Sequence, residues 1–258
     1  MSQQPLDHLP LLVVVLLCIG VTLAFYEVGY RIGRWREQRA TGEISGPTGM
    51  IVGSILALMA FLLAIATGMA ADRFDARRGL VLEEANSIGT TYLRAGYLPA
   101  PYGPQLETLL REYVPLRIVK NQRGLKEKIA RSVELQNEMW VITEKLAREH
   151  GDLPVVAIFI DSLNETIDLH ESRITAGVYA RVPPTVIWFL VAGVIFSVGM
   201  VGYNAGLTER RSMISAVVLA VALSAVLALV VDLDRPSGGL IRTNQQPLVD
   251  LRNSMERR

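Results

Sequence analysis

The chain has 258 residues, of which 50% are hydrophobic and 20% are charged, and its formal net charge at pH 7 is +1. Arginine is interspersed with glutamate and aspartate, so the sequence predicts no basic surface of the kind that binds nucleic acid. The single cysteine, Cys18, excludes a disulfide within the chain, and one thiol cannot form a zinc site of several cysteines.

Four long apolar segments without a charged residue dominate the chain. They are Leu9–Tyr26, Thr48–Ala71, Thr185–Leu207 and Met213–Val231. About 20 such residues cross the hydrocarbon core of a bilayer, whereas a helix on the surface of a soluble protein is apolar on one side only. The sequence therefore predicts a multi-pass membrane protein with four transmembrane helices, and the lipid bilayer is its first partner.

The first apolar segment also has to be compared with a secretory signal peptide. The preceding residues, MSQQPLDHLP, contain no lysine or arginine, and no small-x-small cleavage site follows the segment. Charged residues from Glu27 onward follow it instead. We therefore predict an uncleaved membrane anchor.

The polar stretch between the second and third spans reads as helix throughout, because it shows no alternating strand pattern. Asp72–Leu98 is predicted to continue the second span as one helix, since no proline or turn cluster interrupts it. Two further helices are expected at Gln105–Asn121 and Leu125–His150, and a last one from Asp152 to Pro183. The fold class is thus all-α, with a helical-bundle body inserted between two pairs of transmembrane helices. The predicted divisions are 1–71, 72–184, 185–233 and 234–258.

Small residues recur at helical spacing in three of the spans. They are Gly49, Gly53, Ala57 and Ala64 in the second, Gly199, Gly202 and Gly206 in the third, and Ala216, Ala220, Ser224 and Ala228 in the fourth. Such spacing lets helix backbones approach closely in lipid. The sequence leaves open whether these stripes pack within one subunit or between subunits. If the protein forms a pore, we expect the stripe of the second span near the subunit contact or the pore axis.

No residue set in the sequence indicates catalysis, so we do not expect an enzyme, and no cofactor or metal site is predicted. His170 lies on the apolar side of the last body helix, where a hydrogen-bonded core histidine is favoured over a metal ligand. Asp161, Glu165 and Asp168 share a helix side but lack the Glu-x-x-His pattern of di-metal sites, so we interpret them as a solvated acidic surface. The spans also contain no ionisable residue at their centres, which disfavours an ion-coupled pump but permits a hydrophobic pore.

Two polar clusters are expected on the same side of the membrane, below the second and fourth spans. The first comprises Asp72, Arg73, Asp75, Arg77, Arg78, Glu83, Glu84 and Asn86, and the second Asp232, Asp234, Arg235, Pro236 and Gly239. Acids of one cluster could pair with arginines of the other and fix the tail against the helical body, or the acids could bind a cation. Asp232 either extends the small-residue stripe of the fourth span or marks the water boundary.

The order of the elements and two sequence runs resemble the bestrophin-like family of bacterial membrane proteins. The runs are Asp-Arg-Phe-Asp-x-Arg-Arg with Glu-Ala-Asn-x-Ile-Gly-Thr-x-Tyr-Leu-Arg after Asp72, and Asp-Leu-Asp-Arg-Pro-x-x-Gly-Leu-Ile with Gln-Pro-Leu after Asp232. Bestrophins are pentameric anion channels with four membrane helices, a cytosolic helical body between the second and third, and a tail after the fourth. The resemblance implies a homo-oligomeric anion channel. The alternative is a membrane-anchored scaffold or signalling adaptor, for which the charged helix Leu125–His150 would be the binding element.

Arginine distribution bears on orientation, because positive charge prefers the cytoplasm. An even number of spans places both termini and the body on one side of the membrane. That side carries Arg73, Arg77, Arg78, Arg173, Arg181, Arg235, Arg242, Arg252, Arg257 and Arg258, against Arg31, Arg34, Arg36, Arg39, Arg210 and Arg211 on the other. The larger number favours a cytoplasmic body and cytoplasmic termini in the inner membrane, whereas the short loops alone favour the opposite orientation.

Overall fold

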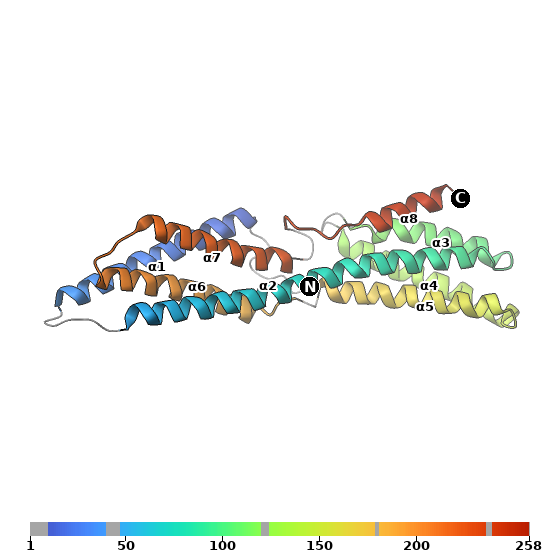
Figure 1. Ribbon diagram of the computed structural model, residues 1–258. Coiled ribbons are helices and arrows are strands. Elements are labelled where there is room, and N and C mark those ends of the chain that lie inside the picture. The colour runs from blue at the N-terminus through green and yellow to red at the C-terminus, as the bar shows by residue number, and fades with distance from the viewer. Residues whose placement is uncertain (1–9, 40–46, 120–123, 179–180, 236–238, 258) are drawn as a thin grey trace. The chain divides into compact units, whose positions relative to one another are not determined.

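The computed structural model describes residues 10–39, 47–119, 124–178, 181–235 and 239–257, and all regular structure within them is helical (Figure 1). The helices are α1 (Leu11–Arg39), α2 (Thr48–Ala95), α3 (Tyr102–Arg117), α4 (Leu125–His150), α5 (Pro154–Val178), α6 (Pro184–Leu207), α7 (Met213–Asp234) and α8 (Gln246–Glu256). The predicted all-α fold class is thereby confirmed. Some residues of the predicted segments and clusters lie outside the described residues, namely Leu9, Asn121, Pro236 and Arg258.

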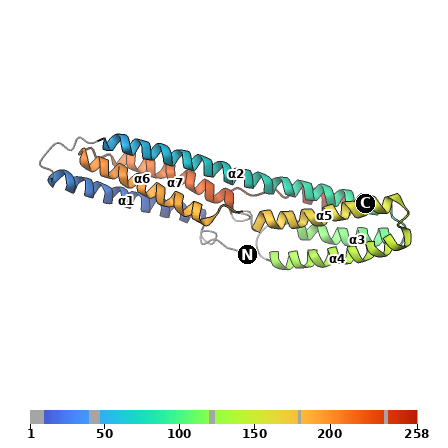
Figure 2. The ribbon, with the colours of Figure 1, turned by 90° about the horizontal axis from the view of Figure 1, so that it is seen from below.

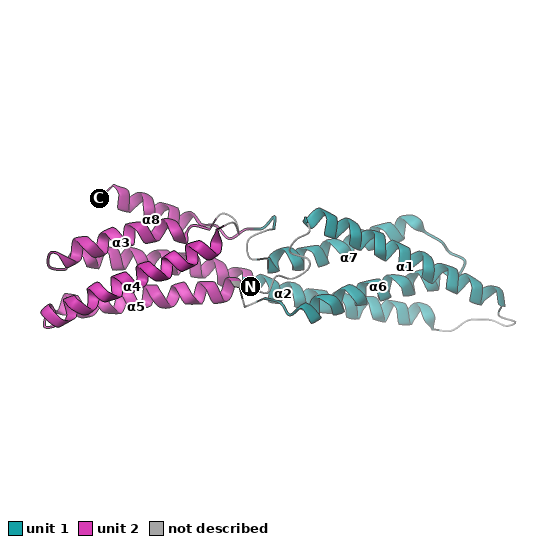
Figure 3. Cartoon of the chain, turned by 180° about the vertical axis from the view of Figure 1, so that it is seen from behind, with its two compact units in different colours: residues 1–73, 181–241 teal, residues 74–180, 242–258 magenta. Residues whose placement is uncertain are grey.

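The chain divides into two compact units, coloured separately in Figure 3. Unit 1 consists of residues 1–73 and 181–241, and unit 2 of residues 74–180 and 242–258. Helix α2 belongs to both, because it continues without interruption from the second span into the body. This continuity agrees with the prediction that no turn follows Ala71.

Unit 1 contains the four helices that are long and apolar enough to cross a membrane: α1, the first part of α2, α6 and α7. They lie alongside one another in Figures 1 and 2. Helix α1 packs mainly against α6 and also against α7, and the three helices meet at Tyr26, Val198 and Ala216. The four predicted spans are therefore present as helices of sufficient length.

Glycine makes the contact between α1 and α6 possible. A Cβ atom at Gly202 would collide with the carbonyl oxygen of Tyr26, and one at Gly206 with the carbonyl oxygen of Tyr30. On α1, a Cβ atom at Gly29 would in turn collide with the carbonyl oxygen of Gly199. Backbones this close gain dispersion energy that bulkier residues would prevent. The small residues of the third span thus pack within the chain.

Unit 2 is a bundle of α3, α4, α5, α8 and the second part of α2, with one apolar core. Its fully buried side chains include Leu106, Leu110, Tyr113, Leu135, Met139, Phe159, Leu163 and Leu248. Helix α4 has the predicted bounds, whereas α3 begins at Tyr102 and ends at Arg117, before the predicted Asn121. The tail helix α8 was not predicted, because an 11-residue helix is marginal alone and depends on packing, here of Leu248 and Met255.

Candidate functional site

Helix α2 buries only one side of its membrane-spanning part. Val52, Met59, Leu63, Ala66 and Ala70 are buried on that side. The predicted small residues lie elsewhere on the helix: Gly49, Gly53, Ala57 and Ala64 are exposed. A Cβ atom at Gly53 or Gly68 would have no other atom within 4 Å. From Gly53 onward, the stripe of the second span is therefore uncovered in the single chain, unlike the stripe of the third.

The small residues of the fourth span are covered by other parts of the chain, unlike those of the second span. Its small residues Ala216, Ala220, Ser224 and Ala228 are all buried in unit 1. Residues 53, 57, 64, 68 and 75 of α2 share one side of the helix, because intervals of four and seven residues are close to whole turns. The uncovered side of α2 thus carries small residues along the span and the exposed carboxylate of Asp75 beyond it.

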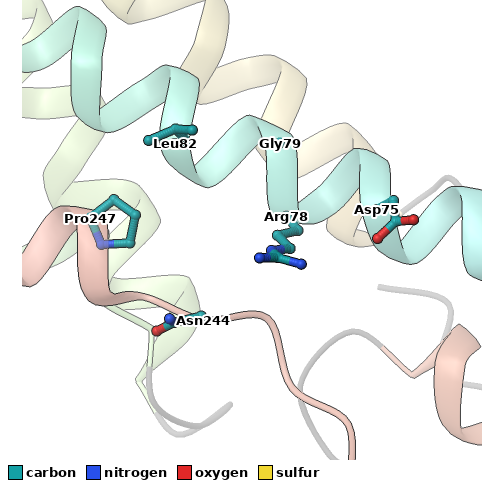
Figure 4. Close-up of a pocket in the computed structure, with 6 residues that line it drawn as sticks. All are labelled: Asp75, Arg78, Gly79, Leu82, Asn244 and Pro247. Atoms are coloured by element: carbon teal, nitrogen blue, oxygen red, sulfur yellow. The ribbon is translucent and has the colours of Figure 1, made fainter.

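A pocket of about 340 Å³ opens in unit 2 beside this part of α2 (Figure 4). It is lined by Asp75, Arg78, Gly79, Leu82, Asn244 and Pro247. The first four belong to α2, and the last two belong to the tail at the start of α8. The structure thus brings residues of the first polar cluster next to the Gln-Pro-Leu run of the tail. The pocket offers groups of both charges together with an amide, but no paired set of catalytic groups.

Glu84 is the centre of a buried charge cluster in unit 2. Its carboxylate accepts a hydrogen bond of 2.6 Å from Nε of Arg117 and pairs with Nη1 of Arg173. The Arg173 guanidinium also donates to Oε1 of Gln245 at 2.6 Å and to the carbonyl oxygen of Arg117 at 3.1 Å. Burial lowers the pKa of Arg173, while Glu84 opposes that shift. The cluster fixes the tail to the bundle.

The tail thus has a contact with the bundle that the sequence did not predict. From the sequence, acids of one polar cluster could pair with arginines of the other, and this pairing stays a prediction. Glu84 does belong to the first cluster, but its partners are Arg117 and Arg173. The tail contributes the uncharged Gln245. No local sequence pattern connects residues from α2, α3, α5 and the tail, so only the packed structure identifies this set.

His170 is the core histidine that the sequence favoured. Its ring is fully buried, and Nδ1 lies 3.0 Å from the hydroxyl of Tyr113, which accepts a hydrogen bond from Nε2 of Gln136. The two groups share one hydrogen bond, in which Nδ1 of the neutral imidazole either accepts from the hydroxyl or donates to it, depending on the tautomer. Burial, and then the charges of Arg117 and Arg173, lower the pKa of His170 to about 3. The side chain is therefore neutral and structural near pH 7.

Hydroxyl groups continue this polar zone between α2 and α5. The Ser87 and Thr166 hydroxyls lie 2.9 Å apart, and Thr91 donates to the carbonyl oxygen of Ser162 at 2.9 Å. All four residues are buried. Their hydrogen bonds satisfy polar groups that water cannot reach, and so fix the position of α5 along α2.

The two aspartates of the second cluster point inward within unit 1. Asp232 accepts hydrogen bonds of 3.0 Å from the backbone N–H groups of Leu240 and Ile241. Asp234 accepts from the N–H of Val182 at 2.7 Å and pairs with Nη2 of Arg181 at 3.0 Å. A Cβ atom at position 239 would collide with the Asp232 carboxylate, which explains why glycine stands there. These carboxylates hold the loop after α7 and the start of α6.

The remaining residues of the two clusters have mixed positions. Arg77 and Arg235 are buried, Arg73 is partly buried, and Asp72, Arg78, Glu83 and Asn86 are exposed. Among the residues with described positions, no group of three or more histidine, cysteine, aspartate or glutamate side chains could hold a metal ion. The cation site that the sequence analysis considered is not formed by the aspartates of the second cluster, because they bind backbone N–H groups and Arg181.

Comparison with known proteins supplies a family and a fold. The Bestrophin-like domain matches residues 13–248 of the chain. The crystal structure of a bacterial bestrophin homologue from Klebsiella pneumoniae is similar, with a TM-score of 0.63, 16% identity, and coverage of 95% of this chain and 96% of that chain. No curated protein matches the chain.

Two single-residue variants of the Klebsiella pneumoniae homologue are also similar. One has a TM-score of 0.68 at 14% identity and covers 94% of this chain and 96% of that chain. The other has a TM-score of 0.67 at 16% identity and covers 97% of both chains. At such low identity the likeness establishes a shared fold, and the matched region includes the four spans and the body.

Proposed function

The chain belongs to the bestrophin-like family, and on this premise we propose that it forms a homo-oligomeric channel for small anions in the bacterial inner membrane. The observation that carries the proposal is the uncovered side of α2. In the single chain, this side exposes Gly53, Ala57 and Ala64. By contrast, Gly202 and Gly206 of α6 and the small-residue stripe of α7 are buried. Several copies of α2 around an axis would give these residues either neighbouring subunits or a pore to face.

A role as a channel also agrees with the chemistry of the site. Conduction through a hydrophobic constriction needs no catalytic group and no charged residue inside the membrane. The uncovered side of α2 is uncharged along its span, and charged residues begin at Asp72. A pore lined by such a surface can conduct dehydrated or partly hydrated ions, and it can close by losing its water.

We place the body and both termini in the cytoplasm as part of the same proposal. The support is the larger number of arginines on that side of the spans. Labelling of single cysteines introduced at Asn137, which lies on α4, and at Thr208, after α6, in a Cys18→Ser background would test it with a membrane-impermeant thiol reagent. Labelling of intact cells at position 208 alone supports the orientation, and labelling at position 137 alone reverses it.

The channel itself is tested with purified protein in liposomes loaded for chloride flux. We expect flux from a detergent-extracted particle that contains several copies of the chain. Ala57→Trp should reduce flux strongly, because it adds bulk on the uncovered side of α2. Val218→Trp is the matched control, since Val218 is exposed and lies on α7 instead of α2.

Two outcomes would contradict the channel. Verified oligomers without flux would remove ion conduction, and a monomer or dimer without flux would favour the scaffold or adaptor instead. The observation that favours this second candidate is the exposed charged network on α4, where Arg131 pairs with Glu112, Glu134 and Glu138. Such a surface fits a soluble partner of mixed charge.

A further inference from the structure

A group of arginines lies where α1 ends and where α6 connects to α7. The group consists of Arg31, Arg34, Arg36, Arg39, Arg210 and Arg211. The acids placed with them in the described residues are Glu27, Glu37 and Glu209, which leaves an excess of three positive charges. We call this end of unit 1 the arginine end.

Ion pairs between these acids and arginines hold the loop after α6 against α1. Arg34 pairs with Glu209, and Arg211 pairs with Glu27 at 2.7 Å. Arg210 stands between these two paired loop residues and is therefore held beside the end of α1. Within the described part of the chain, its exposed guanidinium has no carboxylate partner.

Arg36 and Arg39 are also left without a carboxylate by these pairs. Nη1 of Arg36 donates to the hydroxyl of Tyr203 at 2.9 Å, and the guanidinium of Arg39 lies 4.4 Å from the ring centroid of Trp35. Both contacts leave the positive charge uncompensated while fixing the direction of the side chain. Three exposed cationic groups therefore remain at this end, belonging to α1 and to the loop after α6.

An exposed apolar stripe on α1 leads directly to these charges. Val28, Ile32 and Trp35 are each about half exposed, and with Arg39 they follow one side of the helix at intervals of four, three and four residues. The helix belongs to the set long and apolar enough to cross the membrane. The stripe continues the apolar span Leu9–Tyr26 at its end, so it lies at the interface between lipid chains and headgroups, where Trp also prefers to lie.

We propose that the arginine end binds the headgroup of an anionic phospholipid from the surrounding bilayer. The phosphate groups accept hydrogen bonds from Arg36, Arg39 and Arg210, and an acyl chain lies along Val28 and Ile32. A guanidinium presents several N–H donors to a phosphate and is weakly hydrated, which suits this contact. A soluble anion would use only the charges and would gain nothing from the apolar stripe.

The test compares lipid retention by native mass spectrometry after extraction from vesicles of phosphatidylglycerol mixed with phosphatidylcholine. The triple variant Arg36→Gln, Arg39→Gln and Arg210→Gln should retain about tenfold less phosphatidylglycerol than the unaltered chain, with unchanged retention of phosphatidylcholine. The matched control is Lys126→Gln, Lys145→Gln and Arg148→Gln, which removes the same charge from exposed positions of α4. This control should retain phosphatidylglycerol as before.

Three results would overturn the proposal. Equal retention by the triple variant and the unaltered chain would show that the arginines do not select the lipid. An equal loss in the control would assign the effect to net charge. Displacement of the lipid by inorganic phosphate at matched ionic strength would identify a site for free anions. If the triple variant does not fold, Trp35→Ala and Arg39→Gln are measured singly, and each should lower phosphatidylglycerol retention.

Discussion

At the scale of single residues, Glu84 compensates two positive charges that are buried in the helical body. A carboxylate with no access to water is costly unless its charge is matched and its oxygens are hydrogen-bonded. Both oxygens of Glu84 meet guanidinium groups, and the two arginines come from α3 and α5. Removing the one negative charge would leave two buried positive charges facing each other. The cluster is therefore more sensitive to the loss of Glu84 than to the loss of any exposed acid.

Glu84→Gln should lower the free energy of unfolding by about 3–5 kcal/mol, because it breaks a buried ion pair by removing one partner. Glu83→Gln is the control, since the neighbouring Glu83 is exposed and should cost well under about 1 kcal/mol. Urea unfolding of the detergent-solubilised protein, followed by far-UV circular dichroism, measures both. Similar losses for the two variants would show that the Glu84 cluster does not stabilise the bundle.

His170 should make the free energy of unfolding depend on pH in the acidic range. Its pKa of about 3 in the folded state lies below the unfolded value near about 6.5, so the unfolded chain binds a proton first as the pH falls. Stability from the neutral imidazole is complete above about pH 6.5 and decreases towards about pH 3, by up to about 1.4 kcal/mol per pH unit. The midpoint temperature of thermal unfolding should therefore be lower at pH 4.5 than at pH 7.5.

The substitution His170→Gln separates this residue from the other titrating groups. Glutamine keeps a donor and an acceptor near the Tyr113 hydroxyl but binds no proton, so the acid-dependent fall in the midpoint should become smaller. A variant at position 170 with the original pH profile would assign the acid sensitivity to other groups.

At the scale of elements, the helices were predictable where one property extends over many residues. The four spans follow from uninterrupted apolar sequence, and α4 follows from a glycine at each end. Helix α8 was missed because its formation depends on Leu248 and Met255 packing against the bundle. The partners of Glu84 were missed for a similar reason, since Arg117 and Arg173 are distant from it in sequence.

The small-residue stripes show the limit of a pattern that has two meanings. Helical spacing of glycine and alanine is the same whether the neighbouring helix belongs to the chain or to another copy. The structure separates them, because Gly202 meets the backbone of α1 whereas Gly53 meets nothing. Which residues cover a helix is a property of the assembled bundle and not of the helix sequence.

Gly202→Ala should destabilise unit 1, because the added methyl group would collide with the carbonyl oxygen of Tyr26 and push α1 away from α6. Overpacking of this kind costs about 1–3 kcal/mol. Gly20→Ala adds the same methyl group to an open side of α1 and should be neutral or slightly stabilising. The thermal midpoint in detergent, measured for both variants, tests this difference, and equal midpoints would show that the α1–α6 contact is not tight.

At the scale of the whole molecule, the proposed channel repeats every charge on the uncovered side of α2 once per subunit. A single exposed carboxylate in water has a weak effect on ions at a distance, because salt screens it within about 10 Å. Several copies around one axis concentrate the same charge where ions must pass. Asp72 and Asp75 are the exposed carboxylates at the end of the span, so they would attract cations and repel anions there.

Neutralising these two carboxylates should therefore raise chloride permeability relative to sodium by a few-fold, as read from the reversal potential across a salt gradient in planar bilayers. The variant is Asp72→Asn with Asp75→Asn, which keeps the size of both side chains. Asp152→Asn is the control, because Asp152 is exposed between α4 and α5 and does not lie on α2. An unchanged reversal potential in the double variant would mean that the exposed side of α2 does not face the ion path. The axis of the pore would then have to lie beside another helix.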